Sequence, residues 1–151
     1  TKWYIRIGGN ARDMVSGSKL IEGLPRPRGN FPHAKRVGDF VFVSGTSARR
    51  ANDTIEGAEL DEFGVIQLDI ETQTHATLKT IKIILNEFGA DLEDIVEISS
   101  FLVNMDDFHK YNEAYGEFFD YDGPTRTTVA VHQLPHPHLL VEIKAIAYKP
   151  I

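Results

Sequence analysis

The chain has 151 residues, 42% hydrophobic and 25% charged, with a formal net charge of −6. This length and composition predict one globular domain with its own core, because two domains would need more residues. The acidic balance disfavours a general nucleic-acid binder, and the absence of cysteine excludes disulfides, thiolate nucleophiles and cysteine-ligated zinc.

The amino-terminal part of the chain is predicted to be a loop-rich extension. Residues 3–7 alternate enough to predict a short strand, which a Gly-Gly-Asn sequence would end. Residues 8–30 are rich in glycine, proline, serine and charge, so we expect them to lie as loops over the core. We interpret Arg26 and Arg28, which alternate with prolines, as a solvated surface feature.

Two strands are predicted next, followed by an irregular segment. Residues 35–39 and 40–45 flank a Gly-Asp turn, and the second strand is apolar on both faces. A strand of that kind should be buried on both sides. Residues 46–68 are acidic and predicted to be irregular, with turns near Gly57 and Gly64.

Helical spacing of apolar residues predicts two helices. The first should run over residues 69–88, with Asp69 as its N-cap and Gly89 as its C-cap. The second should run over residues 106–119, and its aromatic stripe is most simply core.

The remaining periodicity predicts strands at residues 95–103, 126–131 and 139–148, the last two joined by a loop rich in proline and histidine. The order of elements favours an α+β fold, in which two helices cover one face of a single sheet. Several strands are apolar on both faces, so we expect another subunit to cover the second face.

An arginine and a glutamate carry the clearest chemical signal. Arg126 follows a Gly-Pro turn at the start of a strand, where its planar fork suits a carboxylate. Glu142 is isolated among apolar residues and could orient or deprotonate a water. Together they indicate a small anionic substrate attacked by water, and the alternative is a salt bridge between them at the sheet edge.

Other site types find little support in the sequence. His136 and His138 could suggest a metal, but the proline between them and the lack of nearby carboxylates favour a polar loop, so no metal site is expected. No phosphate-binding or nucleophile motif is present. No apolar run reaches membrane-spanning length and residues 1–7 lack a signal-peptide pattern, so we expect a cytoplasmic protein.

The order and spacing of several short motifs resemble the Rid (reactive intermediate deaminase, YjgF-type) family of enamine and imine deaminases. The resemblance covers about residues 29–148. Its motifs are Gly29-Asn30-Phe31, Val41-Phe42-Val43-Ser44-Gly45, Tyr111-Asn112-Glu113-Ala114-Tyr115-Gly116-Glu117-Phe118-Phe119, Gly123-Pro124-Thr125-Arg126-Thr127, Leu134-Pro135 and Val141-Glu142-Ile143-Lys144-Ala145-Ile146-Ala147.

The resemblance implies a chorismate-mutase-like α+β fold and a homotrimer with clefts between subunits. It divides the chain into an N-terminal extension (1–28) and a deaminase domain (29–151). It implies that Arg126 binds the substrate carboxylate, that Glu142 positions the attacking water, and that no cofactor is needed. Further cleft positions are matched by Phe31, Ser44, Gly45, Asn112 and Thr128.

Within the family the chain looks most like the 2-aminomuconate deaminases of bacterial aromatic-compound catabolism. This likeness rests on the extension and on the Arg49-Arg50 pair. It implies that 2-aminomuconate and water give 2-oxohex-3-enedioate and ammonia. The second carboxylate of that substrate needs a donor, for which Arg49 or Arg50 is the first candidate and His33 or His132 the weaker ones. The alternative, which we favour slightly for either arginine alone, is that both lie on the surface and pair with the acidic loop after Asn52.

The family often has tyrosine at the position of Phe31 and cysteine at that of Thr128, so the cleft differs from the usual pattern. Two alternatives follow. One is a broad deaminase of 2-aminoacrylate-like intermediates, which needs no second cation. The other is a non-catalytic ligand-binding regulator. Neither nucleic acid nor membrane is an expected partner.

Overall fold

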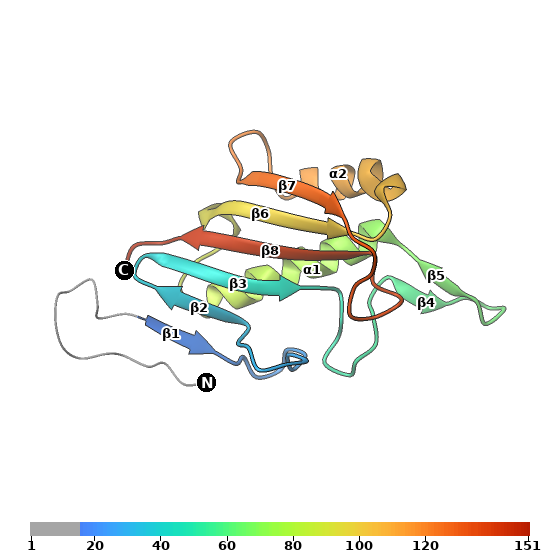
Figure 1. The fold of residues 1–151 in the computed structure, drawn as a ribbon, viewed down its shortest axis with the longest axis horizontal. Coiled ribbons are helices and arrows are strands. Elements are labelled where there is room, and N and C mark those ends of the chain that lie inside the picture. Colours follow the sequence, from blue (N-terminus) through green and yellow to red (C-terminus); the bar gives the residue numbers. More distant parts are fainter. Residues whose placement is uncertain (1–15) are drawn as a thin grey trace.

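The computed structural model describes residues 16–151, in which one mixed sheet carries two helices on one of its faces (Figure 1). The sheet has six strands in the order β1-β2-β3-β8-β6-β7, and only β6 and β7 pair in parallel. Its strands are β1 (Ser16–Lys19), β2 (Ala34–Val37), β3 (Phe40–Thr46), β6 (Ile95–Leu102), β7 (Thr125–Ala130) and β8 (Val141–Tyr148). The expected α+β architecture is therefore confirmed, whereas the strand predicted at residues 3–7 lies outside the described residues.

Helix α1 (Ile70–Asn86) begins at the predicted N-cap, Asp69, but ends two residues before the predicted end at residue 88, with Glu87 as its C-cap in place of Gly89. The Asp69 side chain accepts hydrogen bonds from the backbone N–H groups of Glu71 and Thr72, which the first turn leaves without helical partners. Beyond the last turn, Gly89 has a φ of 76° and the next residue, Ala90, donates back to the Leu85 carbonyl at 3.0 Å. The buried face of α1 packs on the sheet and covers the centre of β3 and β8.

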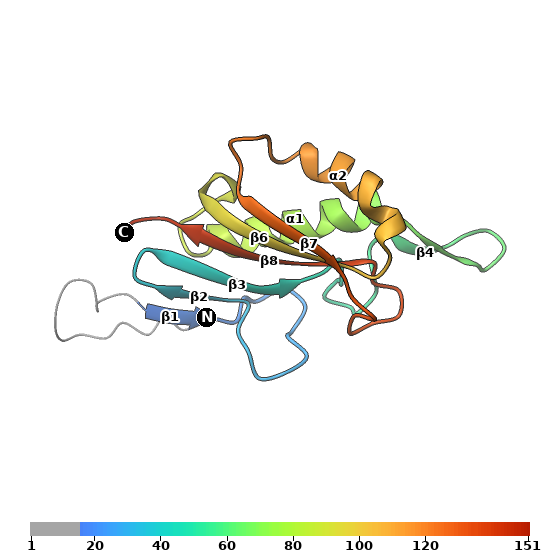
Figure 2. The same ribbon diagram turned by 45° about the horizontal axis from the view of Figure 1, so that its top comes forward.

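Helix α2 (Phe108–Gly116) is shorter than the predicted helix 106–119. The Asn104 side chain caps a 3-10 turn, η3 (Met105–Asp107), and the α-helical hydrogen bonding begins only after it. Tyr111 on α2 is fully buried, and His75 of α1 bonds to Glu117 just past the end of α2. Figure 2 shows that both helices lie on the same side of the sheet.

The strands that the sequence pattern missed are short or polar. In the segment predicted as irregular, β4 (Ala58–Leu60) and β5 (Ile66–Leu68) form a separate hairpin that projects from one end of the molecule (Figure 1). Its turn contains Gly64, with a φ of 77°, as expected from the sequence. Strand β1 lies inside the predicted extension and pairs antiparallel with β2. The predicted boundary between residues 28 and 29 stays a prediction.

One face of the sheet is open in the single chain. Alternate residues of β3 and β8, such as Val41 and Ile143, are buried against α1. On the opposite face Phe40 is 42% exposed, Phe42 43% and Tyr148 45%, and the ring of Phe40 contacts the other two. Among residues 16–151 the helices cover only one face, as expected, so burial of β3 on its second side stays a prediction that depends on another subunit. An aromatic patch of this kind is typical of a protein interface.

We expect this face to be covered by further copies of the chain, and the family resemblance sets the number at three. Light scattering at micromolar concentration should give about three times the chain mass of 17.0 kDa. Phe42→Asp should dissociate the assembly without unfolding the chain, because it places a charge in the covered patch.

Phe63→Asp is the matched control, since Phe63 is 83% exposed on the β4–β5 hairpin, away from the sheet face. A monomeric wild-type protein would contradict the prediction, as would equal dissociation by both variants.

Candidate functional site

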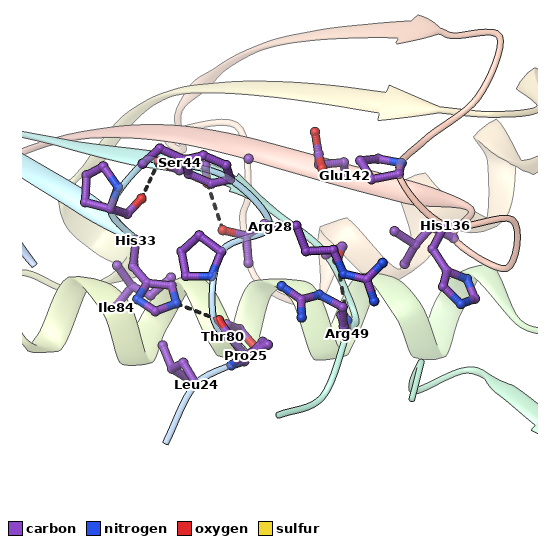
Figure 3. Close-up of a pocket in the computed structure, with 18 residues that line it drawn as sticks. Leu24, Pro25, Arg28, His33, Ser44, Arg49, Thr80, Ile84, His136 and Glu142 are labelled. Atoms are coloured by element: carbon purple, nitrogen blue, oxygen red, sulfur yellow. Dashed lines mark hydrogen bonds between the residues drawn. The ribbon is translucent and has the colours of Figure 1, made fainter. Parts of the chain in front are cut away.

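A pocket of about 100 Å³ lies where β3 ends, between the loop of residues 20–33, helix α1 and the loop that precedes β8 (Figure 3). Several residues predicted to form a site line it. They are Phe31, His33, Ser44, Gly45, Arg49 and Glu142. Residues far apart in the sequence therefore meet here, whereas Arg126, Asn112 and Thr128 of the same predicted set do not line this pocket.

Glu142 is half-buried on β8, and burial raises the pKa of its carboxyl group above the ordinary value of 4.5. The pairing of β3 with β8 is irregular between Val43 and Thr46, and Gly45 lies in this irregularity. A Cβ atom on Gly45 would lie 2.8 Å from Oε2 of Glu142. Only glycine therefore leaves room for the carboxylate in its present position.

Ser44 and His33 hold the loop of residues 20–33 against β3. The Ser44 hydroxyl donates to the Pro32 carbonyl at 2.7 Å. The His33 ring accepts a hydrogen bond from the Ile21 N–H at Nδ1, 2.9 Å away, so its proton lies on Nε2, which donates to the Pro25 carbonyl at 2.8 Å. Both ring nitrogens of His33 are thus used by the backbone, and His33 shapes the pocket without offering it a donor.

Arg126 lies on the edge strand β7, outside this pocket. Its Nη2 donates to Oδ1 of Asn112 on α2 at 2.7 Å. Its guanidinium carbon lies 4.6 Å from the ring centre of Tyr115, 5.2 Å from that of Tyr111 and 5.8 Å from that of Phe108. These rings hold the cation in place and exclude water on one side of it. The aromatic residues of α2, which the sequence pattern indicated only as part of the hydrophobic core, therefore also form one wall of a candidate site.

Two buried hydroxyl groups near Arg126 have no hydrogen-bond partner among the described residues. They belong to Thr128, two residues along β7 from Arg126, and to Tyr115, the nearest of the three rings. Burial raises the pKa of Tyr115 to about 12, so its hydroxyl remains a donor. A buried polar group without a partner is costly, and a bound ligand is one way to satisfy it. Thr128 was a predicted cleft residue, whereas Tyr115 was not.

Arg126 and Glu142 of one chain lie on opposite faces of the sheet. Arg126 is in register with Ile98, which is fully buried beneath the helices. Glu142 is in register with Phe101, on the alternate face of the same strand β6. Since neighbours in register share a face, the two side chains point in opposite directions. The alternative of a salt bridge between them within one chain is therefore excluded.

The two neighbouring arginines of the predicted second-carboxylate site have different surroundings. Arg49 lines the pocket, bonds to Asp53 at 2.6 Å and donates to the Arg26 carbonyl at 2.6 Å. Arg50 instead bonds to Glu59 at 2.6 Å and does not line the pocket. Both arginines thus pair with acidic residues that follow Asn52, as the alternative expected, although Arg49 also lines the pocket. Arg28, which the sequence indicated as a solvated surface residue, also lines the pocket.

Among residues 16–151 no group of three or more histidine, aspartate and glutamate side chains could hold a metal ion. The rings of His136 and His138 contact each other edge-on, with centres 5.0 Å apart. Within the same part of the chain, neither helix has the length and apolar character needed to cross a bilayer.

Comparisons with known proteins identify the family. Residues 22–149 match the family model described as Endoribonuclease L-PSP. A RutC family protein of Pyrococcus abyssi is 37% identical over 130 residues, which are 86% of this chain and 94% of that protein. A 2-iminobutanoate/2-iminopropanoate deaminase of Dermatophagoides farinae is 31% identical over 124 residues, which are 81% of this chain and 88% of that protein.

Among solved structures, E. coli TdcF with bound serine is similar with a TM-score of 0.70 and 30% identity, covering 87% of this chain and 98% of that one. The chain belongs to this family, the YjgF or Rid family that its motifs resemble.

The hydrogen bonds of His33 give a prediction that separates a structural role from substrate binding. His33→Ala removes both bonds to the backbone of the loop and should lower the free energy of unfolding by about 1–3 kcal/mol. Urea denaturation would measure the change, with the exposed His132→Ala as control. Unchanged stability in His33→Ala would show that these bonds contribute nothing and would return His33 to the candidates for ligand binding.

Proposed function

We propose that the protein is a hydrolytic deaminase of enamine and imine carboxylates, that its site lies between two copies of the chain, and that its substrate is 2-aminomuconate. The observation that carries the proposal is the pair of half-sites: Arg126 among aromatic rings on one face, and the half-buried Glu142 beside Gly45 on the other. The name of the D. farinae relative, an imine deaminase, supports the same chemistry.

Arg126 binds the substrate carboxylate next to the amino-bearing carbon. Asn112 holds one of its nitrogens, and the rings of Tyr111 and Tyr115 fix the plane of its fork. A planar guanidinium fixed in this way can receive a carboxylate through two parallel hydrogen bonds and so set the orientation of the reacting carbon. The buried hydroxyls of Thr128 and Tyr115 are available to the same ligand.

Glu142, from the second copy, activates water. The enamine first tautomerises to an imine, whose carbon is electrophilic. Glu142 orients a water and takes one of its protons as the oxygen adds to the C=N carbon. Glu142 returns this proton to the nitrogen, which gives the carbinolamine. Glu142 then takes the hydroxyl proton and passes it to the amino group, so the C–N bond breaks and ammonia leaves as the carbonyl forms. Glu142 ends the cycle ionised, and the chemistry uses no cofactor.

Phe31, Ser44 and Gly45 form the wall of the cleft on the side of Glu142. The Ser44 hydroxyl is used by the Pro32 carbonyl, so its part is to hold the loop that carries Phe31. The exposed ring of Phe31 provides an apolar surface for the carbon chain of the substrate.

The name of the family model suggests a second chemistry, cleavage of RNA. The net charge of −6 gives that reading little support, since phosphate binding needs a basic surface. The direct test is ammonia release from freshly generated 2-aminomuconate, compared with 2-aminoacrylate. Turnover of both with a preference for the larger acid supports the proposal. A preference for 2-aminoacrylate would favour the broad deaminase, and no release from either would favour a ligand-binding regulator.

Glu142→Gln should fold normally and lower kcat by about 10²–10⁴, because the amide cannot take a proton. In the wild type, kcat should fall as pH is lowered through the raised pKa of Glu142, above 4.5, since only the carboxylate acts as base in the substrate complex. A full pH–rate profile measures both effects. An acid limb that persists unchanged in the residual activity of Glu142→Gln would assign that limb to another group.

The stability of the same variant provides a second check on the sign of the shift. The folded protein holds the Glu142 proton more tightly than the unfolded chain does. The charged carboxylate therefore costs stability progressively as pH rises above 4.5, and the cost levels off above the folded pKa. Glu142→Gln should accordingly gain stability over the wild type at neutral pH and lose that advantage in acid.

Arg126→Ala should lower kcat/KM by about 30-fold to 1,000-fold, the value of a bidentate charged contact, and Arg126→Lys should not restore it. Because each site would take Arg126 from one copy and Glu142 from another, mixing subunits of Arg126→Ala and Glu142→Gln should regenerate activity. Random assembly leaves about one site in four intact. Recovery should follow denaturation and joint refolding of the two variants, whereas separately refolded samples should stay inactive. Joint refolding without recovery would contradict a shared site.

A further inference from the structure

Two arginines share one carboxylate at the mouth of the pocket. Nη1 of Arg49 lies 2.6 Å from Oδ1 of Asp53, and Nη2 of Arg28 lies 3.6 Å from the same oxygen. The two guanidinium groups are therefore close together, although Arg28 and Arg49 come from different loops. Figure 3 shows both among the residues that line the pocket, with Glu142 on its opposite wall.

The charges in this cluster are not balanced. Two cations face one anion, and the side chain of Arg49 is only 14% exposed. Asp53 is 62% exposed and lies on a turn with a φ of 68°, a conformation that residues other than glycine rarely adopt. Asp53 thus reaches the arginines from the solvent side, whereas the guanidinium of Arg49 is largely enclosed by protein.

The rest of the pocket suits an organic acid. Leu24, Ile84 and Leu139 provide apolar walls. His136 accepts a hydrogen bond at Nδ1 from the backbone N–H of His138, at 3.0 Å, so the proton of the neutral ring lies on Nε2 and can be donated. An apolar pocket with a few convergent donors is typical of a small-molecule site.

We infer that Arg28 and Arg49 form the binding site for a second carboxylate of the substrate, and that Asp53 is the counter-ion which this carboxylate displaces. The inference rests on the proposed function and specifies its substrate class as dicarboxylate enamines. The reacting carbon lies near Glu142, and the far carboxylate lies at the two arginines that line the same pocket. Exchange of one carboxylate for another avoids leaving the enclosed charge of Arg49 without a partner.

The competing explanation is that this cluster only ties two loops together, because Arg49 also donates to the Arg26 carbonyl. A structural tie would affect stability and all substrates alike. A carboxylate site affects only ligands that carry the second charge. The two explanations therefore differ in the selectivity of the variants, with the neighbouring Arg50 as a matched control because it pairs with Glu59 away from the pocket.

The first experiment compares kcat/KM for 2-aminomuconate and 2-aminoacrylate in Arg28→Gln, Arg49→Gln and Arg50→Gln. Arg49→Gln should raise KM for the dicarboxylate by about tenfold to 100-fold, as expected for loss of a charged hydrogen bond, and should leave the monocarboxylate within about twofold. Arg28→Gln should act in the same direction and less strongly, since Arg28 is the more exposed. Equal losses on both substrates, or an Arg50→Gln variant as selective as Arg49→Gln, would overturn the inference.

Asp53→Asn tests displacement itself. It keeps the shape of the side chain and removes the competing charge, so KM for the dicarboxylate should fall by about threefold to tenfold while KM for the monocarboxylate stays constant. An unchanged or higher KM for the dicarboxylate would show that Asp53 is a fixed partner of the arginines and not a displaceable one.

A second experiment does not depend on the proposed reaction. Titration calorimetry compares trans,trans-muconate with sorbate, which has a methyl group in place of the second carboxylate. The wild type should bind muconate at least about tenfold more tightly, and Arg49→Gln should abolish the difference. Equal binding of the two acids by the wild type would overturn the carboxylate site. If 2-aminomuconate is not deaminated and muconate is still preferred, the proposed substrate fails and the carboxylate site stands.

Discussion

The alternation of side chains along a β-strand is the constraint on which the candidate site depends. Strand β6 separates β7 from β8, and its register places Arg126 with the buried Ile98 and Glu142 with Phe101. No rotamer change brings together two side chains that leave opposite faces of one sheet. A ligand that touches both must lie between two chains. The proposed enzyme would therefore be active only when its subunits are assembled.

The open sheet face connects subunit assembly with the site at Glu142. Glu142 and Tyr148 lie an even number of positions apart on β8, so they share a face with the aromatic patch of Phe40 and Phe42. A second copy that covers this patch would also enclose Glu142. Arg126 lies on the last strand of the sheet, where no further strand blocks the approach of a neighbour. In the proposed assembly, the subunit that covers the aromatic patch of one chain would therefore also complete the site at Glu142.

The sequence predicted best those elements whose ends are set by interactions between residues close together in the chain. Helix α1 begins as predicted because the Asp69 side chain bonds to N–H groups two and three residues away. Its last helical residue is Asn86, two residues before the predicted end, although Gly89 still marks the turn that follows. Strands β1, β4 and β5 were missed because each has only three or four residues, which is too short for apolar alternation to be recognised, so pairing defines them. The predicted second helix was too long because the cap at Asn104 forms a 3-10 turn first.

The site was predicted less completely than the fold, for the same reason. The motifs selected Arg126, Asn112 and Glu142 as candidates. Which face of the sheet Arg126 and Glu142 occupy depends on how β7 and β8 pair with β6, and the motifs do not contain that information. Arg28 was interpreted as a surface residue because its place in the pocket depends on a loop that folds back to Asp53. A tyrosine in an apolar stripe resembles core, and only the structure shows that the Tyr115 hydroxyl is buried beside a cation with no partner among residues 16–151.

The electrostatics of the proposed two-chain site follow from these separations. In the single chain, burial raises the pKa of Glu142, and no cation is among the causes of the shift. A guanidinium brought near by the second copy would lower that pKa and weaken Glu142 as a base. A substrate carboxylate bound to Arg126 neutralises this cation, so the basicity of Glu142 is restored only when the site is loaded. The enzyme would thus gain its base at the moment that a water molecule has something to attack.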